Sequence, residues 1–373
     1  MDLFMEYPSN ISLGTSNNTI LKPEKTGCHT YRFFVKPERI GNLEWKFWYS
    51  NVVDSTWDKG EVSYANMPGS SWKIRSASVA TAGFDKNCRR QIPVLFNGQR
   101  SKEIAPAESF WSDSVTIVIS PDDYLAFTWC VELDENAVIP ITPDSQAPCY
   151  YASGDCCEYV ALEKFTIAEG APMPNLFGAK TEVETFLAFI GDSITQGCGT
   201  ENDNYEHWVP KIAKILGNKT SVWNLGLGFG RAQDAASYGS WLNKAMYYNT
   251  VSICLGVNDI LPHGGRNKDE IYNDLTKIVE LLKASSPTRK VIIFTIPPFD
   301  LMQDELNTWQ LINNEICNVL AKKVDDIFDI RTVLSKPKPN ENMTIYGAHT
   351  NGMGGTEIAE AFCKWYLNNK KLI

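Results

Sequence analysis

Residues 186–197 read FLAFIGDSITQG. Five apolar residues in a row, 186–190, are followed at once by Gly191 and Asp192, which predicts a buried parallel strand that ends in a tight turn. The turn exposes Ser193 at the end of the strand, where an open α/β sheet places its chemistry. A serine after Gly-Asp is more often a helix cap than a nucleophile. A catalytic role for Ser193 therefore depends on the segments downstream.

After Glu182 the hydrophobic pattern changes, and apolar runs of strand length alternate with amphipathic helical segments. The expected strands are 186–190, 221–225, 251–255, 291–296 and 327–330, and the expected helices are 206–216, 233–246, 268–284, 305–322 and 355–367. Five β-α units in succession predict a doubly wound parallel sheet between helices. The loops after the strands then share one face with Ser193.

The first half of the chain, from about residue 30 to 170, has an all-β pattern. Strand-like runs at 43–49, 72–80, 92–96, 114–119 and 124–133 are separated by turn signals at 68–69, 97–98 and 120–123. Short strands at this spacing predict a β-sandwich. Residues 140–180 are expected to connect the two halves and to hold one strand, 159–167. The predicted domains are 1–180, the β-sandwich, and 181–373, the α/β domain.

Composition narrows the classes of function. A chain of 373 residues exceeds what one hydrophobic core usually serves. A net charge of −9 without a long basic run argues against nucleic acid or an anionic membrane surface as the main partner, and favours a small neutral or weakly polar substrate. The N-terminus lacks a basic and then apolar leader pattern, and no apolar run reaches membrane-spanning length, so a cytoplasmic location is expected.

The cysteine and tryptophan residues are interpreted as structural and not as binding sites. The ten cysteines are scattered, which favours free thiols in a reducing compartment. Cys149, Cys156 and Cys157 lie together but lack a Cys-x-x-Cys pair and a nearby histidine, which argues against zinc. Six tryptophans of the first half could form a sugar-stacking surface, but core or interdomain packing is the favoured interpretation: Trp45, Trp48, Trp57, Trp72, Trp111 and Trp129.

Three further segments place unusual residues on the face that carries Ser193. They read NLGLGFGR at 224–231, GVND at 256–259 and YGAHTNG at 346–352. Acyl transfer needs a nucleophile, a base that takes its proton, and donors aimed at the developing oxyanion. Ser193 can be the nucleophile and His349 the base. The donors can be the backbone N–H of Ser193, a glycine N–H of the 226–230 loop and the side-chain amide of Asn258.

This ordered set of motifs, GDSITQG, the glycine-rich block, GVND and the histidine block, resembles the SGNH/GDSL hydrolase family. The resemblance implies a flavodoxin-like α/β/α fold and ester hydrolysis that uses neither a metal nor a cofactor. It also implies that Ser193 is the nucleophile, that His349 is the base, and that Asn258 and a loop glycine, Gly228 or Gly230, complete the oxyanion hole. Residues 93–119 are similar to the β-rich domain that precedes this hydrolase in some two-domain bacterial members.

The chain departs from the family pattern at two positions. The aspartate that usually stands three residues before the base is Tyr346, and the glycine expected five residues after Asn224 is Phe229. We therefore expect a Ser-His dyad in which a backbone carbonyl of residues 342–347 orients His349, with the carboxylate of Glu341 as the alternative.

Other titratable residues near the motifs are expected to be structural. Asp192 and Asp259 are interpreted as turn-forming side chains that bond to the backbone of their own loops. His29, His207 and His263 have no motif around them and are expected to be surface or satisfied histidines.

These patterns lead to an expected activity. We expect a serine esterase that hydrolyses small acyl esters, with O-acetyl groups on carbohydrate as the favoured substrate. The enzyme alternative is a lipid-directed esterase or thioesterase, and the non-enzyme alternative is a carbohydrate-binding protein on a decayed hydrolase scaffold. The oligomeric state is left open.

Overall fold

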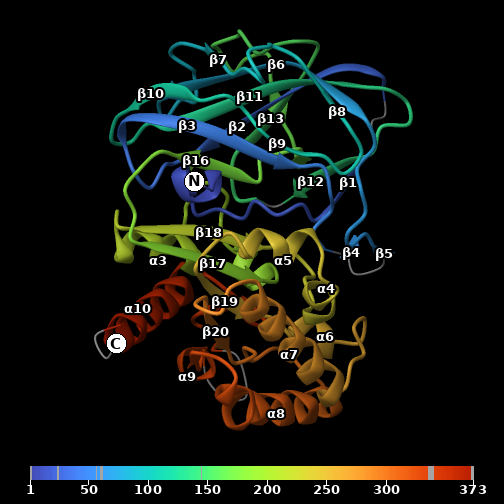
Figure 1. Cartoon of the computed structure of the whole chain (residues 1–373), viewed down its shortest axis with the longest axis vertical. Helices are drawn as coiled ribbons and strands as arrows, with labels where there is room; N and C mark the ends of the chain where they lie inside the picture. The colour runs from blue at the N-terminus through green and yellow to red at the C-terminus, as the bar shows by residue number, and fades with distance from the viewer. Residues whose placement is uncertain are drawn as a thin grey trace.

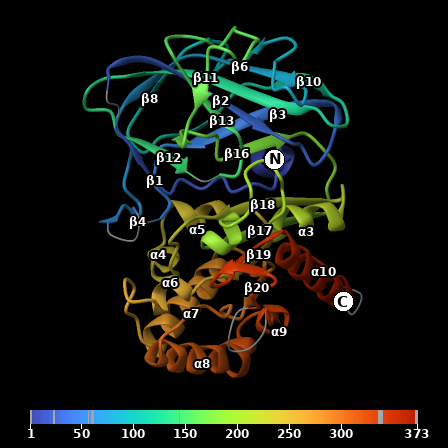
Figure 2. The same cartoon turned by 180° about the vertical axis from the view of Figure 1, so that it is seen from behind.

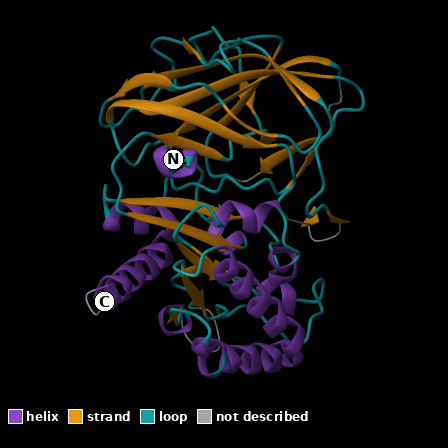
Figure 3. Cartoon of the chain, viewed as in Figure 1, coloured by secondary structure: helices purple, strands orange, loops and turns teal. Residues whose placement is uncertain are grey.

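The chain folds into a β-rich part stacked on an α/β part, with the N-terminus lying between them (Figure 1). This is a computed structural model, and it describes residues 2–22, 25–55, 57–58, 62–143, 145–334 and 340–370. Figure 3 shows the same division by secondary structure, with strands dominating one part and helices the other. Helix α1 (Leu3–Glu6) is the short element that marks the N-terminus between the two parts.

Two antiparallel sheets form the β-rich part, which confirms the predicted β-sandwich. The larger sheet has seven strands: β14 (Thr166–Ile167), β13 (Cys149–Ser153), β2 (Gly27–Val35), β11 (Tyr124–Leu133), β6 (Trp72–Ala82) and β7 (Ile92–Pro93) in order, with β8 (Lys102–Ile104) also on β6. The smaller sheet has four strands: β10 (Val115–Ile119), β3 (Gly41–Ser50) and β16 (Leu176–Ala179) in order, with β9 (Ser109–Trp111) also on β3. The apolar faces of both sheets supply one buried core, because alternate residues of each strand point inward.

Smaller strand groups complete this part. They are a three-stranded sheet of β1 (Thr19–Leu21), β12 (Ile139–Pro143) and β15 (Gly170–Ala171), and the antiparallel pair β4 (Trp57–Asp58) and β5 (Val62–Ser63). Residues 140–180 are therefore not a plain connection, because five strands in and next to this stretch, β12 to β16, pair within the β-rich part. Trp45, Trp48, Trp72 and Trp129 are buried, as the packing interpretation expects, while the side chain of Trp57 lies outside the described residues.

Two strands predicted in this part are wrong in extent. Of 159–167 only β14 is strand, and the preceding residues turn, with the Phe165 N–H donating to the Leu162 carbonyl. Tyr159 and Val160 are exposed there, so their β propensity is not used in a ladder. Of 92–96 only Ile92 and Pro93 form strand β7 on β6, and the Val94 N–H adds one further hydrogen bond to the Ala77 carbonyl of β6.

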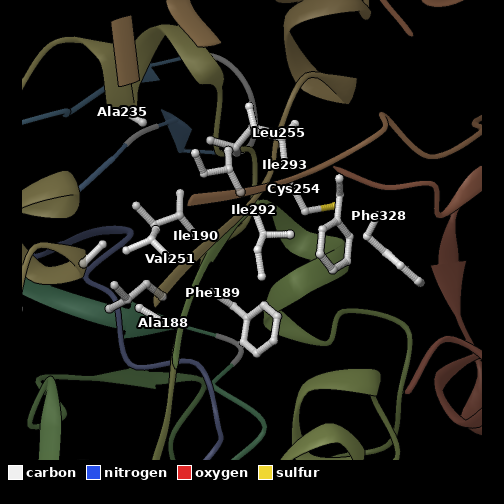
Figure 4. Packing of buried hydrophobic residues seen from close by; sticks show 14 of the residues in the cluster. Ala188, Phe189, Ile190, Ala235, Val251, Cys254, Leu255, Ile292, Ile293 and Phe328 are labelled. Atoms are coloured by element: carbon white, nitrogen blue, oxygen red, sulfur yellow. The ribbon is translucent and has the colours of Figure 1, made fainter. Parts of the chain in front are cut away.

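The α/β part holds a five-stranded parallel sheet in the order β18 (Thr220–Gly226), β17 (Thr185–Gly191), β19 (Thr250–Cys254), β20 (Lys290–Phe294) and β21 (Asp326–Phe328). This order confirms the predicted flavodoxin-like, doubly wound sheet. Figure 4 shows why the strands are continuous apolar runs: Ala188, Phe189 and Ile190 of β17 pack beside Val251 and Ile292 in the sheet core.

Helices cover both faces of this sheet (Figures 1 and 2). Helices α3 (Trp208–Leu216) and α10 (Gly352–Lys370) pack together on one side. The other side carries α4 (Ala232–Ala236), α5 (Ser240–Ala245), α7 (Lys268–Ser285) and α8 (Gln303–Asn318). The remaining short elements are α2 (Ser193–Gln196), α6 (Val257–Ile260), α9 (Arg331–Leu334), the 3₁₀ turn η1 (Leu320–Lys322) and the hairpin strands β22 (Thr344–Tyr346) and β23 (His349–Thr350).

The single helix expected over 233–246 is broken into α4 and α5. Tyr238 takes a left-handed φ of 61°, and Gly239 follows it. A side chain at Gly239 would place its Cβ 1.5 Å from the Asn66 Oδ1 of the β-rich part. The close approach of that loop therefore explains both the glycine and the break.

The two parts are joined along the edge strand β18. The Ser221 hydroxyl donates to the Ser9 carbonyl, and the Thr15 N–H donates to the Asn224 carbonyl. One buried core cluster includes Phe4 as well as the strands of the parallel sheet. The N-terminal segment 9–18 is thus packed against the α/β part, and a boundary between residues 180 and 181 stays a prediction.

Candidate active site

Ser193 begins helix α2 at the end of β17. The Asp192 carboxylate caps this helix, with Oδ1 accepting from the Ile194 N–H at 2.9 Å. Gly191 must lack a side chain, because a Cβ there would lie 1.8 Å from Thr195 Oγ1. The sharp turn leaves Ser193 half-buried at the edge of the sheet, where the sequence predicts it.

Ser193 Oγ lies 2.7 Å from His349 Nε2, although 156 residues separate the two in the chain. His349 begins β23, the second strand of a small hairpin, and is only 6% exposed. A neutral imidazole protonated at Nδ1 can accept the serine proton at this distance. The structure thus brings together the two residues that the sequence proposes as nucleophile and base.

Packing holds the His349 ring in place. The Tyr346 ring lies against it with centroids 4.2 Å apart, and the Phe299 ring meets its edge at 5.6 Å. Gly199 permits the close passage of the neighbouring loop, since a Cβ there would come within 3.2 Å of His349 Cβ. Gly347 has φ 52° and no room for a side chain, because its Cβ would lie 2.4 Å from the Phe299 ring.

No carboxylate of the described residues bonds to His349. Its Nδ1 is buried without a partner at full hydrogen-bond geometry. Burial lowers the pKa of His349 from 6.5 to about 4, and the nearby backbone carbonyl of Tyr346 opposes this shift. The carbonyl is thus close enough to interact with the ring but is not placed as a standard acceptor. At neutral pH the imidazole is uncharged, as a general base must be.

The hairpin that carries His349 is anchored by Asp300, a residue that the sequence interpretation missed. Asp300 Oδ2 accepts from the Gly347 N–H at 2.9 Å. Glu341, the predicted alternative partner of His349, instead lines a cavity of about 680 Å³ together with Asp300 and Tyr346. No local motif marks Asp300, because its contact spans 47 residues of sequence.

Asn258 lies in α6, directly after β19 and Gly256. Its Nδ2 donates to the Gly230 carbonyl at 3.2 Å, which ties it to the glycine-rich loop. His263 Nε2 lies 3.4 Å from Asn258 Oδ1. A histidine N–H in this position would fix which end of the amide faces the loop. His263 is thus next to the site rather than an isolated surface histidine.

The glycine-rich loop forms a turn at the end of β18. The Gly230 N–H donates to the Leu227 carbonyl at 3.2 Å, so this amide is already engaged. The Gly228 and Phe229 amides have no acceptor among the described residues. Phe229, which stands where the family has glycine, adopts a left-handed φ of 58°.

Asp192 bonds to the backbone of its own turn, as expected, whereas the expectation for Asp259 is wrong because its carboxylate bonds to a different loop. Asp259 accepts from the N–H groups of Ala232 and Gln233 at the start of α4. Burial raises the pKa of Asp259 to about 6 and that of Asp192 to about 7. Both carboxylates face backbone amides of their own or neighbouring loops and keep the site loops in register.

The other two histidines differ from each other. His29 is satisfied, with its ring nitrogens 3.0 Å from the Tyr151 hydroxyl and 2.8 Å from the Lys25 carbonyl. His207 is fully buried beneath Gly197, and neither ring nitrogen has a partner among the described residues. Burial lowers the pKa of His207 to about 3, so it stays neutral and acts as packing.

The described residues contain neither a metal-binding cluster nor a membrane-spanning helix. No group of three or more His, Cys, Asp or Glu side chains in the described part of the chain could hold a metal ion. None of the ten cysteines, all of which lie in the described ranges, forms a disulfide. Among the described helices, none combines the length and the apolar character that crossing a bilayer requires.

Comparisons with known proteins agree with the motifs. Residues 189–354 match the model of the GDSL-like lipase/acylhydrolase family. An uncharacterized protein of Mycoplasma pneumoniae is 28% identical over 159 residues, which is 38% of this chain and 17% of that protein. The chain therefore spans less than a fifth of the length of this curated relative.

Solved structures with a similar arrangement include three esterases or lipolytic proteins. A member of the lipolytic protein G-D-S-L family from Veillonella parvula is 20% identical, with a TM-score of 0.40 over 48% of this chain and 96% of its own. A family two carbohydrate esterase from Clostridium thermocellum is 12% identical, with a TM-score of 0.43 over 98% and 99%. A family 3 carbohydrate esterase from Talaromyces cellulolyticus is 19% identical, with a TM-score of 0.40 over 51% and 100%. Residues 189–354, which contain Ser193, Asn258 and His349, are thus the part of the chain that is similar to the GDSL-like lipase/acylhydrolase family.

Proposed function

We propose that this protein is a serine esterase that removes small acyl groups, O-acetyl groups above all, from carbohydrate. The single observation that carries the catalytic half of this proposal is the 2.7 Å contact between Ser193 Oγ and His349 Nε2. It pairs a nucleophile with a neutral base at the carboxyl end of a parallel sheet, next to an amide side chain and free backbone N–H groups.

The reaction follows from these groups. His349 Nε2 takes the Ser193 proton as Oγ bonds to the acyl carbon, and the carbonyl electrons move to the oxygen. The Ser193 N–H, the Asn258 amide and an N–H of the 226–230 loop stabilise that oxyanion. Its collapse breaks the ester bond, and His349 gives the proton to the leaving alcohol. Water then attacks the acyl-enzyme by the same route and releases the acid.

A Ser-His dyad is the second part of the proposal. The packing of the Tyr346 and Phe299 rings orients His349, the Tyr346 carbonyl interacts with the imidazole, and no acidic partner is needed. A carbonyl stabilises the imidazolium less than a carboxylate does, since it carries no full charge. Rigid placement of the ring compensates in part, because a preorganised base needs no reorientation during the reaction.

The carbohydrate half of the proposal rests on the cavity of about 680 Å³ beside Tyr346. Two carboxylates, Asp300 and Glu341, line it and can accept hydrogen bonds from hydroxyl groups. Tyr346 is 50% exposed on the cavity wall while its ring also touches the catalytic imidazole. An aromatic face beside carboxylates suits a sugar whose acetylated hydroxyl reaches Ser193.

A lipid-directed activity is the competing proposal, and one observation favours it. Met302 and Ile345 border the same cavity with 74% and 59% of their surfaces exposed. Such apolar side chains could hold a longer acyl chain instead of a sugar. The two proposals therefore differ in which side of the ester the cavity receives.

One panel of substrates separates them. Wild type and Ser193→Ala are assayed on p-nitrophenyl esters of two to twelve carbons and on acetylated xylo- and cello-oligosaccharides. We expect Ser193-dependent turnover that falls with chain length and releases acetate from the oligosaccharides. Rising kcat/KM with chain length would favour the lipid-directed enzyme. Absence of Ser193-dependent turnover on every ester would favour the decayed, carbohydrate-binding scaffold.

A further inference from the structure

We propose that Asn18, a residue of the β-rich part, positions the oxyanion hole by holding the Gly228–Phe229 peptide, and that the loop donor is the Phe229 N–H. This inference rests on the proposed esterase function and goes beyond it, because it makes the β-rich part a component of the catalytic geometry. Asn18 is a positioning residue, since it acts on the oxyanion only through this peptide.

Asn18 lies directly before β1 and reaches across to the α/β part. Its backbone N–H donates to the Ile141 carbonyl at 2.8 Å, so its position is set by the β-rich part. Its Nδ2 donates to the Gly228 carbonyl at 2.8 Å, a contact that spans 210 residues of sequence. The side chain is only 6% exposed, so solvent competes little for this hydrogen bond.

The contacted peptide is the central peptide of a β-turn. The Gly230 N–H donates to the Leu227 carbonyl, which makes Gly228 and Phe229 the two central residues. Phe229 has φ 58°, while Gly228 is not among the residues with positive φ. Positive φ at the second central residue alone is the geometry of a type II turn.

A phenylalanine is a poor residue for this position. Type II turns favour glycine there, because a Cβ at positive φ meets the backbone. The same four residues could form a type I turn without that strain if the central peptide rotated by about half a turn. The Asn18 hydrogen bond opposes this rotation, since it is made only when the Gly228 carbonyl points toward the β-rich part.

The orientation of that peptide decides what the loop offers to the oxyanion. In a trans peptide the carbonyl and the following N–H point in opposite directions. With the Gly228 carbonyl on Asn18, the Phe229 N–H points away from the β-rich part. The side chain of Phe229 lies on the Asn258 side of the loop. Its ring contacts His263, and His263 Nε2 is 3.4 Å from Asn258 Oδ1. A flipped peptide would replace this N–H donor by a carbonyl oxygen, which repels the oxyanion.

The test is the Asn18→Ala variant assayed on p-nitrophenyl acetate. We expect kcat to fall between about tenfold and about a thousandfold, with KM changed less than about threefold, because the lost donor acts on the transition state. The matched control is Ser221→Ala, which removes a hydrogen bond to Ser9 of the same N-terminal segment but lies at the far end of β18. This control should keep the wild-type kcat.

A second substitution tests the peptide itself. Phe229→Gly removes the steric cost of positive φ, so Asn18→Ala/Phe229→Gly should recover most of the lost kcat. If Asn18→Ala does not fold, Asn18→Asp repeats the test, because it keeps the volume and loses the donor. Wild-type kcat in folded Asn18→Ala or Asn18→Asp, or no recovery with Phe229→Gly, would overturn the proposal. An inactive wild type would instead count against the esterase function itself.

Discussion

The ring of Tyr346 lies 4.2 Å from the ring of His349, at an interplanar angle of 38°. Tyr346 occupies the position at which the related hydrolases carry the aspartate that orients the base. Here the aromatic ring packs against the imidazole, and its own carbonyl interacts with it. His349, the proposed base, is therefore buried by its neighbour instead of forming an ion pair with it, and this burial affects the pH dependence of the proposed activity.

The acid limb of the pH profile should lie unusually low. Burial lowers the pKa of His349 to about 4, and the base works only when it is deprotonated. Activity should therefore be full above that pKa and be lost as the pH falls through it. We expect kcat/KM for p-nitrophenyl acetate to reach half its plateau near pH 4. A midpoint near the ordinary value of 6.5 would show that an acidic partner supports His349 in solution.

Removing the proposed nucleophile should abolish turnover without harming the fold. Ser193 Oγ makes its side-chain hydrogen bond to His349, so Ser193→Ala costs little packing. We expect kcat to fall by about a thousandfold or more, with an unchanged melting temperature. Turnover close to that of wild type would refute the assignment of Ser193.

Much of the α/β part and its motifs could be predicted from the sequence. Buried parallel strands are continuous apolar runs, so 186–190 and 251–255 were recognisable without a partner. The β-rich part was harder. Strand β2 contains His29, Thr30 and Arg32, whose polar side chains interrupt the apolar pattern. All three are buried, and Arg32 is accommodated by donating to Thr128 on β11.

The supporting residues of the site could not be predicted, because their signals are not local. Ser193, His349 and Asn258 stand in recognisable motifs, whereas Asp300 and Asn18 act through backbone groups 47 and 210 residues away. Only the three-dimensional fold reveals such pairs.

His263 should act through Asn258. The Asn258→Ala variant loses an oxyanion donor, so kcat should fall about a hundredfold to a thousandfold with little change in KM. His263→Ala should lower kcat by a smaller factor, since it only frees the amide to rotate. In the Asn258→Ala background, the His263 substitution should have no further effect. Independent, additive losses would instead place His263 in another role.

The dyad predicts that Glu341 is dispensable and Tyr346 is not. Glu341 lines the cavity and is not hydrogen-bonded to His349, so Glu341→Gln should keep nearly full activity on p-nitrophenyl acetate. Tyr346→Ala removes the ring that packs on the base and should lower kcat roughly tenfold or more, because a misplaced base reacts slowly. The opposite ranking, with Glu341→Gln as inactive as His349→Ala, would overturn the dyad.

A buried ion pair joins the two parts of the chain. Lys244 of α5 contacts the Asp54 carboxylate, and the side chains are 1% and 0% exposed. Asp54 Oδ2 also accepts from the Asn17 N–H at 2.8 Å, which links the pair to the N-terminal segment.

Lys244→Met leaves this carboxylate buried and unpaired, so we expect a loss of about 3–5 kcal/mol in the free energy of unfolding. Adding Asp54→Asn removes the stranded charge but keeps an acceptor for Asn17, and stability should partly recover. The control Lys219→Met breaks an exposed pair with Glu184 and should leave the stability nearly unchanged. Equal costs for Lys244→Met and Lys219→Met would show that the buried pair does not hold the two parts together. If the buried pair does hold the two parts together, a chain cut to residues 181–373 should be unstable, because this shortened chain lacks Asp54 and leaves β18 uncovered.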